Sequence, residues 1–191
     1  MTQFYPAQAI MDRWPETQPE FVLVHHSAGN PNQTKEELRD WFIVGRKSEG
    51  YSWIGYNAVI WPDGTVVQTR PFNKRGGHCP SNDMNSKSIG ICFMGNYSSM
   101  LPTATAWASF KKLLSEIYRD FDINPNKVIT HRDIKATLCP GDALYAELKN
   151  HVHVPPAPTE DLKEVEPCTC DLSKFTPEEL VDELSARIKS K

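Results

Sequence analysis

Two residues of the kinds that bind zinc, His131 and Cys139, lie eight positions apart in the second half of the chain. Two more imidazoles, His25 and His26, follow an apolar run that begins at Phe21. Imidazole nitrogen and thiolate sulfur are ordinary zinc ligands, and a catalytic zinc site keeps its fourth position open for water. The sequence therefore suggests a catalytic Zn²⁺ held by one of the paired histidines together with His131 and Cys139.

The same residues also have a simpler interpretation. A histidine at the end of a strand is often a hydrogen-bonded structural residue, and an isolated cysteine is often a small buried apolar one. The sequence contains no compact Cys-x-x-Cys or His-x-x-x-His pattern, which would favour a metal. Residue type and spacing alone leave the metal site and the structural interpretation both open.

The neighbouring sequence predicts the elements that would position these side chains. The runs before His25 and His131 are short and apolar, as expected of buried strands, and the segment around Cys139 predicts a loop that leads into a helix. Side chains alternate between the two faces of a strand, so only one of His25 and His26 can face a common site. Alternation does not say which of the two it is.

Periodicity along the rest of the chain predicts one mixed α/β domain. Thr34 and Glu37 form a capping box at a helix start, and Pro62-Asp63-Gly64 is typical of a hairpin turn. Alternating strands and helices of this kind predict a single central mixed β-sheet flanked by helices. The expected elements are strands at 21–25, 88–95 and 126–130, a hairpin at 53–70, helices from 34, at 103–119 and at 142–150, and a long surface loop at 71–87.

Composition excludes several classes of protein. The chain has 191 residues, 39% of them hydrophobic, which is enough for one core. Its formal net charge of −3 provides no broad positive field, so we expect no nucleic acid partner. No run approaches the roughly 18 apolar residues of a membrane span, so we expect none. The first residues do not resemble a secretory signal, which predicts synthesis in a cytoplasm.

Changes in composition divide the chain into four parts. Residues 1–20 read as an N-terminal arm, 21–152 as the main domain, 153–170 as a proline-rich acidic linker and 171–191 as an amphipathic helix. A helix of that length is marginal alone, so we expect it to contact the main domain, a second copy or a partner. The role of Cys168 and Cys170 in the linker stays open.

Several separated motifs occur in an order that resembles a known family. The chain is similar to the zinc-dependent N-acetylmuramoyl-L-alanine amidases, a superfamily that includes bacteriophage endolysins and peptidoglycan recognition proteins. The resemblance covers about residues 20–150, which makes 21–152 the expected catalytic domain. Its motifs are Val24–Ala28, Ile54–Asn57, Asp63–Thr65, His78, Ser88–Ile91, His131–Asp133 and Thr137–Gly141.

This resemblance implies a zinc ligand set. In the family, the first ligand precedes the Ser-Ala pair by one residue, which selects His25 over His26. The other two ligands would be His131 and Cys139, with one Zn²⁺ per chain. The resemblance also implies hydrolysis, by a zinc-activated water, of the amide bond between N-acetylmuramic acid and the L-alanine of the stem peptide.

Further site residues follow from the same resemblance. Tyr56 takes the place of the family's catalytic tyrosine, and Thr137 the place where some phage enzymes carry lysine. His78, Trp53 and Asn85 are expected to bind substrate. For His78 an ordinary loop histidine is the simpler interpretation, and for Trp53 it is half-buried packing.

The resemblance leaves the biological role open. A phage endolysin that acts on the host cell wall after release is the preferred interpretation, with bacterial peptidoglycan as the partner. A cytoplasmic amidase that recycles anhydro-muropeptides would carry the same ligands. A binding module that does not cut is less favoured because such members of the superfamily typically lack the cysteine ligand, and a regulatory partner protein has no support in the sequence.

Overall fold

The structure is a computed structural model, and it describes residues 1–151. The predicted linker at 153–170, with Cys168 and Cys170, and the predicted helix at 171–191 lie outside the described residues. Within residues 1–151, no helix combines the length and apolar character that crossing a membrane requires.

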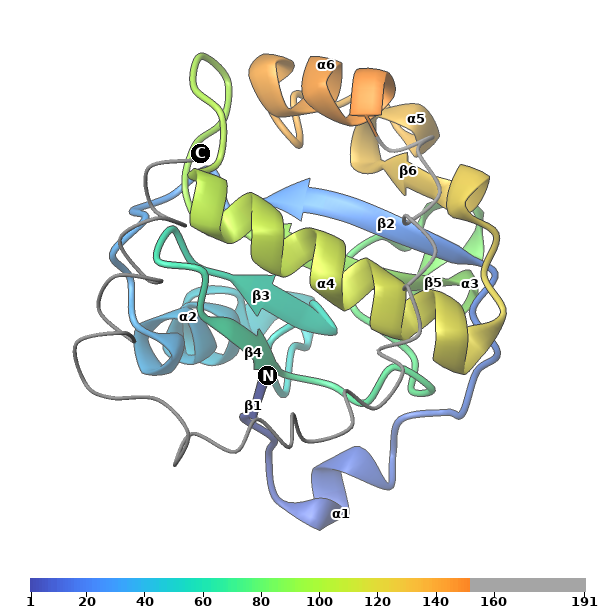
Figure 1. The fold of residues 1–191 in the computed structure, drawn as a ribbon. Coiled ribbons are helices and arrows are strands. Elements are labelled where there is room, and N and C mark those ends of the chain that lie inside the picture. Colours follow the sequence, from blue (N-terminus) through green and yellow to red (C-terminus); the bar gives the residue numbers. More distant parts are fainter. Residues whose placement is uncertain (152–191) are drawn as a thin grey trace, which may run out of the picture. The chain divides into compact units, whose positions relative to one another are not determined.

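A six-stranded mixed sheet forms the centre of the domain, in the order β1-β4-β3-β5-β2-β6. β2 is parallel to both of its neighbours, β5 and β6, and β3 is parallel to β5, whereas β3 and β4 form an antiparallel hairpin. Figure 1 shows helices packed on the sheet, which confirms the predicted fold class. The strands are β1 (Thr2–Gln3), β2 (Phe21–His26), β3 (Ala58–Ile60), β4 (Val66–Gln68), β5 (Ser88–Phe93) and β6 (Val128–Thr130).

Threonine side chains cap the starts of helices α2 and α4. The Thr34 hydroxyl accepts from the Glu37 backbone N–H at the start of α2, and Thr103 caps α4 in the same way. The α-helices are α1 (Gln8–Met11), α2 (Lys35–Asp40), α3 (Met84–Lys87), α4 (Ala104–Phe121), α5 (His131–Ile134) and α6 (Asp142–His151). A π-helix, η1 (Trp41–Gly45), continues α2, and 3-10 turns lie at η2 (Lys47–Glu49), η3 (Ser81–Asp83) and η4 (Pro125–Lys127).

Apolar side chains cover both faces of the sheet. Phe110 and Ile117 of α4 and Leu144 of α6 pack against alternate residues of β2, β3 and β5 on one face. Leu38 and Phe42, from α2 and η1, pack with Val59 and Cys92 on the other face. Each face is therefore closed by a separate cluster, as expected for parallel central strands.

Three segments differ from the sequence-based expectations. The hairpin strands are shorter than 53–70, because residues 53–57 form bends before β3 begins. Part of the predicted surface loop is buried, including His78, Cys79 and Asn85. The arm at residues 1–20 is not wholly irregular, because β1 pairs with β4. In each case tertiary contacts outweigh a weak local pattern.

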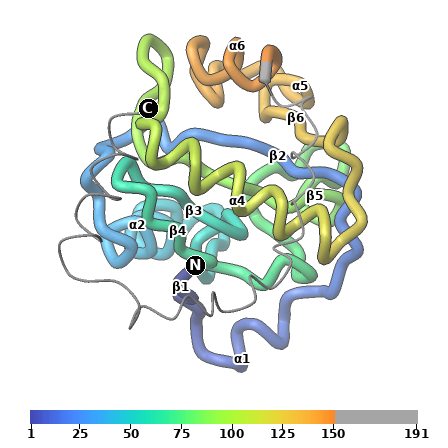
Figure 2. Tube along the Cα trace, in the orientation of Figure 1, coloured from blue at the N-terminus to red at the C-terminus, as the bar shows by residue number. Residues whose placement is uncertain are grey.

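The strand order places two predicted ligands at the same edge of the sheet. β2 and β6 are parallel neighbours, and Val24 pairs with Thr130. His25 and His131 are the residues that follow in each segment, so both lie at the carboxyl ends of adjacent strands. Figure 2 traces the chain from β6 through α5 to α6 beside β2, and the loop between these two helices carries Cys139.

Candidate metal centre

The structure brings together the three residues predicted as zinc ligands. One side-chain atom from each of His25, His131 and Cys139 lies within 4.8 Å of the others. His25 Nδ1 is 3.7 Å from Cys139 Sγ, and the two imidazole ring centroids are 4.6 Å apart. Two strand ends and one loop therefore converge on a single point.

This donor set fits zinc. Tetrahedral coordination with ordinary Zn–N and Zn–S bonds places a nitrogen and a sulfur ligand about 3.5 Å apart. The 3.7 Å separation of His25 Nδ1 and Cys139 Sγ is close to that value. His131 Nε2 is buried and has no hydrogen-bond partner, as expected of a nitrogen that binds a metal ion.

Burial keeps both imidazoles neutral, which is the state that binds metal. It lowers the pKa of His25 well below the ordinary value, and the neighbouring histidines lower it further. Burial also lowers the pKa of His131, with a smaller contribution from Lys135. The Cys139 thiol behaves in the opposite way, since burial raises its pKa to about 11 despite the nearby His26 backbone N–H and Arg132.

Arg132 ties the loop that carries Cys139 to the strand end that carries His131. One guanidinium nitrogen donates to the Leu138 carbonyl and another to the Asp142 carboxylate, both at 2.7 Å. Arg132 thus links the residue before the thiol to the start of α6. This role of Arg132 is not predicted from the sequence, although its place directly after a predicted ligand is a signal for it.

Gly141 allows the loop to turn close to the neighbouring backbone. Its φ is +93°, and a Cβ at this position would lie 2.4 Å from the Tyr97 carbonyl. Side chains are strained at such a φ, and backbone atoms cannot move aside at little cost. The glycine after Cys139 and Pro140 is therefore required by the path of the loop.

His26 faces away from the three ligands. Its Nδ1 accepts a hydrogen bond from the Tyr97 backbone N–H at 3.2 Å, and its own backbone N–H donates to Cys139 Sγ at 3.4 Å. Burial lowers the pKa of His26 to about 4, with a further contribution from Arg132. The ring of His26 is thus hydrogen-bonded to the loop at Tyr97, and its backbone N–H is hydrogen-bonded to the Cys139 thiol.

Tyr56 and Thr137 lie next to the ligands. The Tyr56 ring centroid is 5.3 Å from that of His25, and Phe42 packs against its ring. Burial raises the pKa of Tyr56 well above its ordinary value, so the hydroxyl stays protonated and able to donate. The Thr137 hydroxyl accepts from the Cys139 backbone N–H at 3.3 Å and keeps its own hydrogen for another acceptor.

The three residues expected to bind substrate are buried, and each contacts other parts of the protein. Trp53 is 8% exposed and packs against Phe4, with 5.2 Å between ring centroids. Asn85 is 6% exposed, and its Oδ1 accepts from the backbone N–H groups of His78 and Cys79 at 2.7 Å each. His78 lies behind His25, with its Nδ1 3.0 Å from His25 Nε2. All three therefore make packing or hydrogen-bond contacts inside the domain.

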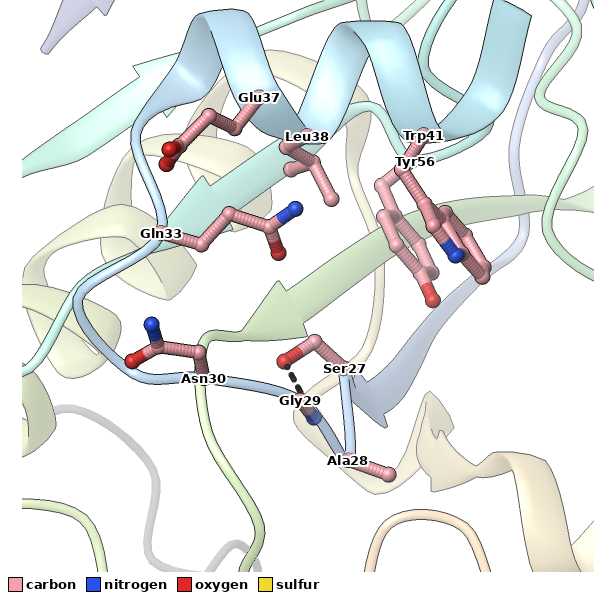
Figure 3. A pocket seen from close by; sticks show the side chains of 9 residues that line it. All are labelled: Ser27, Ala28, Gly29, Asn30, Gln33, Glu37, Leu38, Trp41 and Tyr56. Carbon is pink, nitrogen blue, oxygen red and sulfur yellow. Dashed lines mark hydrogen bonds between the residues drawn. The ribbon is translucent and has the colours of Figure 1, made fainter. Parts of the chain in front are cut away.

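A cavity of about 550 Å³ lies beside Tyr56, between the loop that follows His26 and helix α2. Trp41 borders it and is 47% exposed. Figure 3 shows the Tyr56 hydroxyl directed toward the loop at Ser27, and the Gln33 side chain within the cavity. The lining residues are Ser27, Ala28, Gly29, Asn30, Gln33, Glu37, Leu38, Trp41 and Tyr56.

Comparisons with known proteins agree with this geometry. A family model described as N-acetylmuramoyl-L-alanine amidase matches residues 15–142. Peptidoglycan-recognition protein SC2 of Drosophila simulans is 34% identical over 134 residues, which cover 68% of this chain and 72% of that protein. Among solved structures, the N-acetylmuramoyl-L-alanine amidase LysC from Clostridium intestinale URNW superposes with a TM-score of 0.65 at 26% identity, covering 81% of this chain and 99% of the other. A Drosophila PGRP-LB variant in complex with tracheal cytotoxin gives a TM-score of 0.65 at 25% identity, covering 80% and 96%.

Proposed function

Because the chain belongs to the N-acetylmuramoyl-L-alanine amidase family, we propose that it hydrolyses the amide bond between N-acetylmuramic acid and L-alanine in peptidoglycan, with one Zn²⁺ per chain. The resemblance drawn from the sequence motifs is confirmed at the level of the superfamily. The observation that carries the proposed reaction is the meeting of two neutral imidazoles and a thiol beside a partly buried tyrosine.

The proposed chemistry divides among five side chains. His25, His131 and Cys139 would hold Zn²⁺, which when bound acidifies a water and polarises an amide carbonyl. Hydrolysis of an amide develops negative charge on the carbonyl oxygen, and fixed donors aimed at that oxygen accelerate the reaction. We assign this role to the hydroxyls of Tyr56, whose ring lies beside that of His25, and of Thr137, which is hydrogen-bonded to the Cys139 backbone. We assign delivery of a proton to the departing L-alanine amine to Tyr56.

A digest of purified peptidoglycan tests the reaction. Stem peptides with a free L-alanine N-terminus, identified by mass spectrometry, are expected from the wild type and not from a chelator-treated sample. Restoring Zn²⁺ to the treated sample is expected to restore release. If the wild type sediments with the wall and releases nothing, the protein binds peptidoglycan without cutting it, as the names of its recognition-protein relatives allow.

We further propose that the natural substrate is the polymeric wall, as for an endolysin that reaches the wall after release from the cytoplasm. The open cavity beside Tyr56 supports an extended substrate, and one structural relative is named an endolysin amidase. Parallel assays on intact sacculi and on a soluble anhydro-muropeptide compare the two roles. Faster turnover of the soluble fragment would favour recycling instead.

Zinc binding is expected to release about one proton per ion near neutral pH. The pKa of Cys139 is raised to about 11, so the thiol of the metal-free protein is protonated, whereas both imidazoles are already neutral. Binding needs the thiolate, so the affinity should rise about tenfold per pH unit between roughly pH 7 and pH 9. Calorimetry in buffers of different ionisation enthalpy measures the proton count; a value near zero would contradict thiolate ligation.

Trp41 is expected to contribute to substrate binding as an exposed aromatic surface at the cavity. Replacing Trp41 with alanine should raise KM for soluble muropeptides about 5- to 20-fold, since losing one aromatic contact costs about 1–2 kcal/mol, with kcat little changed. Val44 is the matched control, because it lies in the same π-helix, is 71% exposed and does not line the cavity. An unchanged KM in Trp41→Ala would remove Trp41 from the binding surface.

A further inference from the structure

We propose that His78 is a positioning residue that fixes the tautomer of His25 and thereby reserves His25 Nδ1 for the metal. The inference rests on the metal site of the proposed function and concerns a residue outside its ligand set. It assigns His78 a role in metal affinity in place of the substrate contact expected from the sequence.

The two ring nitrogens of His25 face different groups. Nδ1 is 3.7 Å from Cys139 Sγ, on the side where the ligands meet. Nε2 is 3.0 Å from Nδ1 of His78, which is hydrogen-bond distance. A neutral imidazole carries one N–H, so one of these two rings must donate and the other must accept. If His25 donated from Nε2, its Nδ1 would keep the lone pair that a metal needs; if it accepted there, Nδ1 would carry the proton.

The position of the metal ligands favours the first arrangement. Nδ1 is the nitrogen of His25 that faces Cys139 Sγ, so a metal held there needs the lone pair of Nδ1 and leaves the proton of His25 on Nε2. Nδ1 of His78 lies 3.0 Å from that Nε2 and is the acceptor that this arrangement requires.

Two glycines pack closely against the imidazole ring of His78. A Cβ added to Gly90 would lie 2.3 Å from His78 Cδ2, and one added to Gly76 would lie 2.5 Å from the same atom. Gly90 is in the middle of β5, where glycine weakens a strand and often marks a close approach. Asn85 fixes the backbone on the other side by accepting from the N–H of His78. These contacts hold the His78 ring with its Nδ1 next to His25 Nε2.

This arrangement supplies what metal-binding histidines generally require. The nitrogen that does not bind the metal usually donates to a fixed acceptor, which sets both the tautomer and the orientation of the ring. Loss of such a partner typically costs 10- to 100-fold in metal affinity. A neutral imidazole in this place orients His25 without adding negative charge beside the site.

Two substitutions with side chains of similar shape distinguish the effect of the hydrogen-bond acceptor at residue 78 from the effect of side-chain packing. His78→Asn keeps an oxygen near the place of Nδ1, whereas His78→Leu has the same branching at Cγ and no acceptor. Zinc affinity, measured by competition with a chromogenic chelator, is expected to fall about 10- to 100-fold in His78→Leu and to stay within about threefold of wild type in His78→Asn. Gly90→Ala keeps the imidazole but displaces it, so it should resemble His78→Leu.

The tautomer itself is measured by long-range proton–nitrogen NMR of the metal-free wild-type protein. A proton on Nε2 of His25 is the expected result, and a proton on Nδ1 would overturn the proposal even if His78→Leu failed to fold. Wild-type affinity in His78→Leu, or equal losses in the leucine and asparagine variants, would also overturn it. Failure of the wild type to bind zinc would instead refute the proposed function, so the two failures are distinguishable.

Discussion

Replacing Cys139 with serine is expected to abolish both tight zinc binding and hydrolysis. The substitution exchanges a soft thiolate for a hydroxyl that stays protonated at neutral pH, which removes one of the three ligands that converge within 4.8 Å. Metal ions supply several kcal/mol of transition-state stabilisation in hydrolases, so the rate of stem-peptide release should fall by at least about 10³-fold. Metal analysis and a peptidoglycan digest measure the two effects.

Cys79→Ala is the matched control for this experiment. Cys79 is buried in a small cluster with Leu23 and Met84, and it is not among the ligands. We expect its zinc content and activity to match the wild type, with a modest loss of stability from the smaller side chain. Cys139→Ser should still sediment with the wall, because the cavity at Trp41 is unaltered. A zinc-bound and active Cys139→Ser protein would contradict the proposed ligand set.

Local signals predict where the candidate ligands lie in the fold, whereas the assignment of His25, His131 and Cys139 as ligands comes from the family resemblance. Apolar strands end at His25 and close to His131, and strand adjacency then places both histidines at one edge of the sheet. The choice between His25 and His26 was beyond local reasoning, since alternation alone is symmetric between the two faces. The family resemblance resolved it, and the contact of His26 with Tyr97 now gives the structural reason.

The supporting residues could not be predicted because their surroundings form only in the folded chain. His78 lies in a segment with no periodicity, and the space for its ring depends on Gly76, two residues before it, and on Gly90 in β5. Trp41 lies three residues after the buried Leu38, a spacing typical of one packed helix face, yet it is 47% exposed at the start of the π-helix. Local patterns therefore did not predict the surroundings of these two residues.

Replacing Tyr56 with phenylalanine is expected to lower kcat about 10²- to 10³-fold, the usual effect of removing one donor from a developing oxyanion. Zinc affinity and thermal stability should stay close to wild type, because the ring keeps its contacts with His25 and Phe42. Tyr118→Phe is the control. Tyr118 is another tyrosine whose pKa burial raises, here to about 12, and it packs in the cluster on the opposite face of the sheet. Wild-type kcat in Tyr56→Phe would exclude a catalytic role for its hydroxyl.

Two substrates with different leaving groups distinguish which of the two roles assigned to Tyr56 accounts for the loss of kcat. If the hydroxyl delivers a proton to the departing amine, a substrate with a less basic amine needs less help, and the deficit of Tyr56→Phe should shrink with that substrate. If the hydroxyl stabilises the carbonyl oxygen, the deficit should be the same for both substrates, because that oxygen is common to them. Thr137→Val provides the comparison, since we assign Thr137 only to the oxygen. Its deficit should be independent of the leaving group, so a response confined to Tyr56→Phe would identify the proton donor.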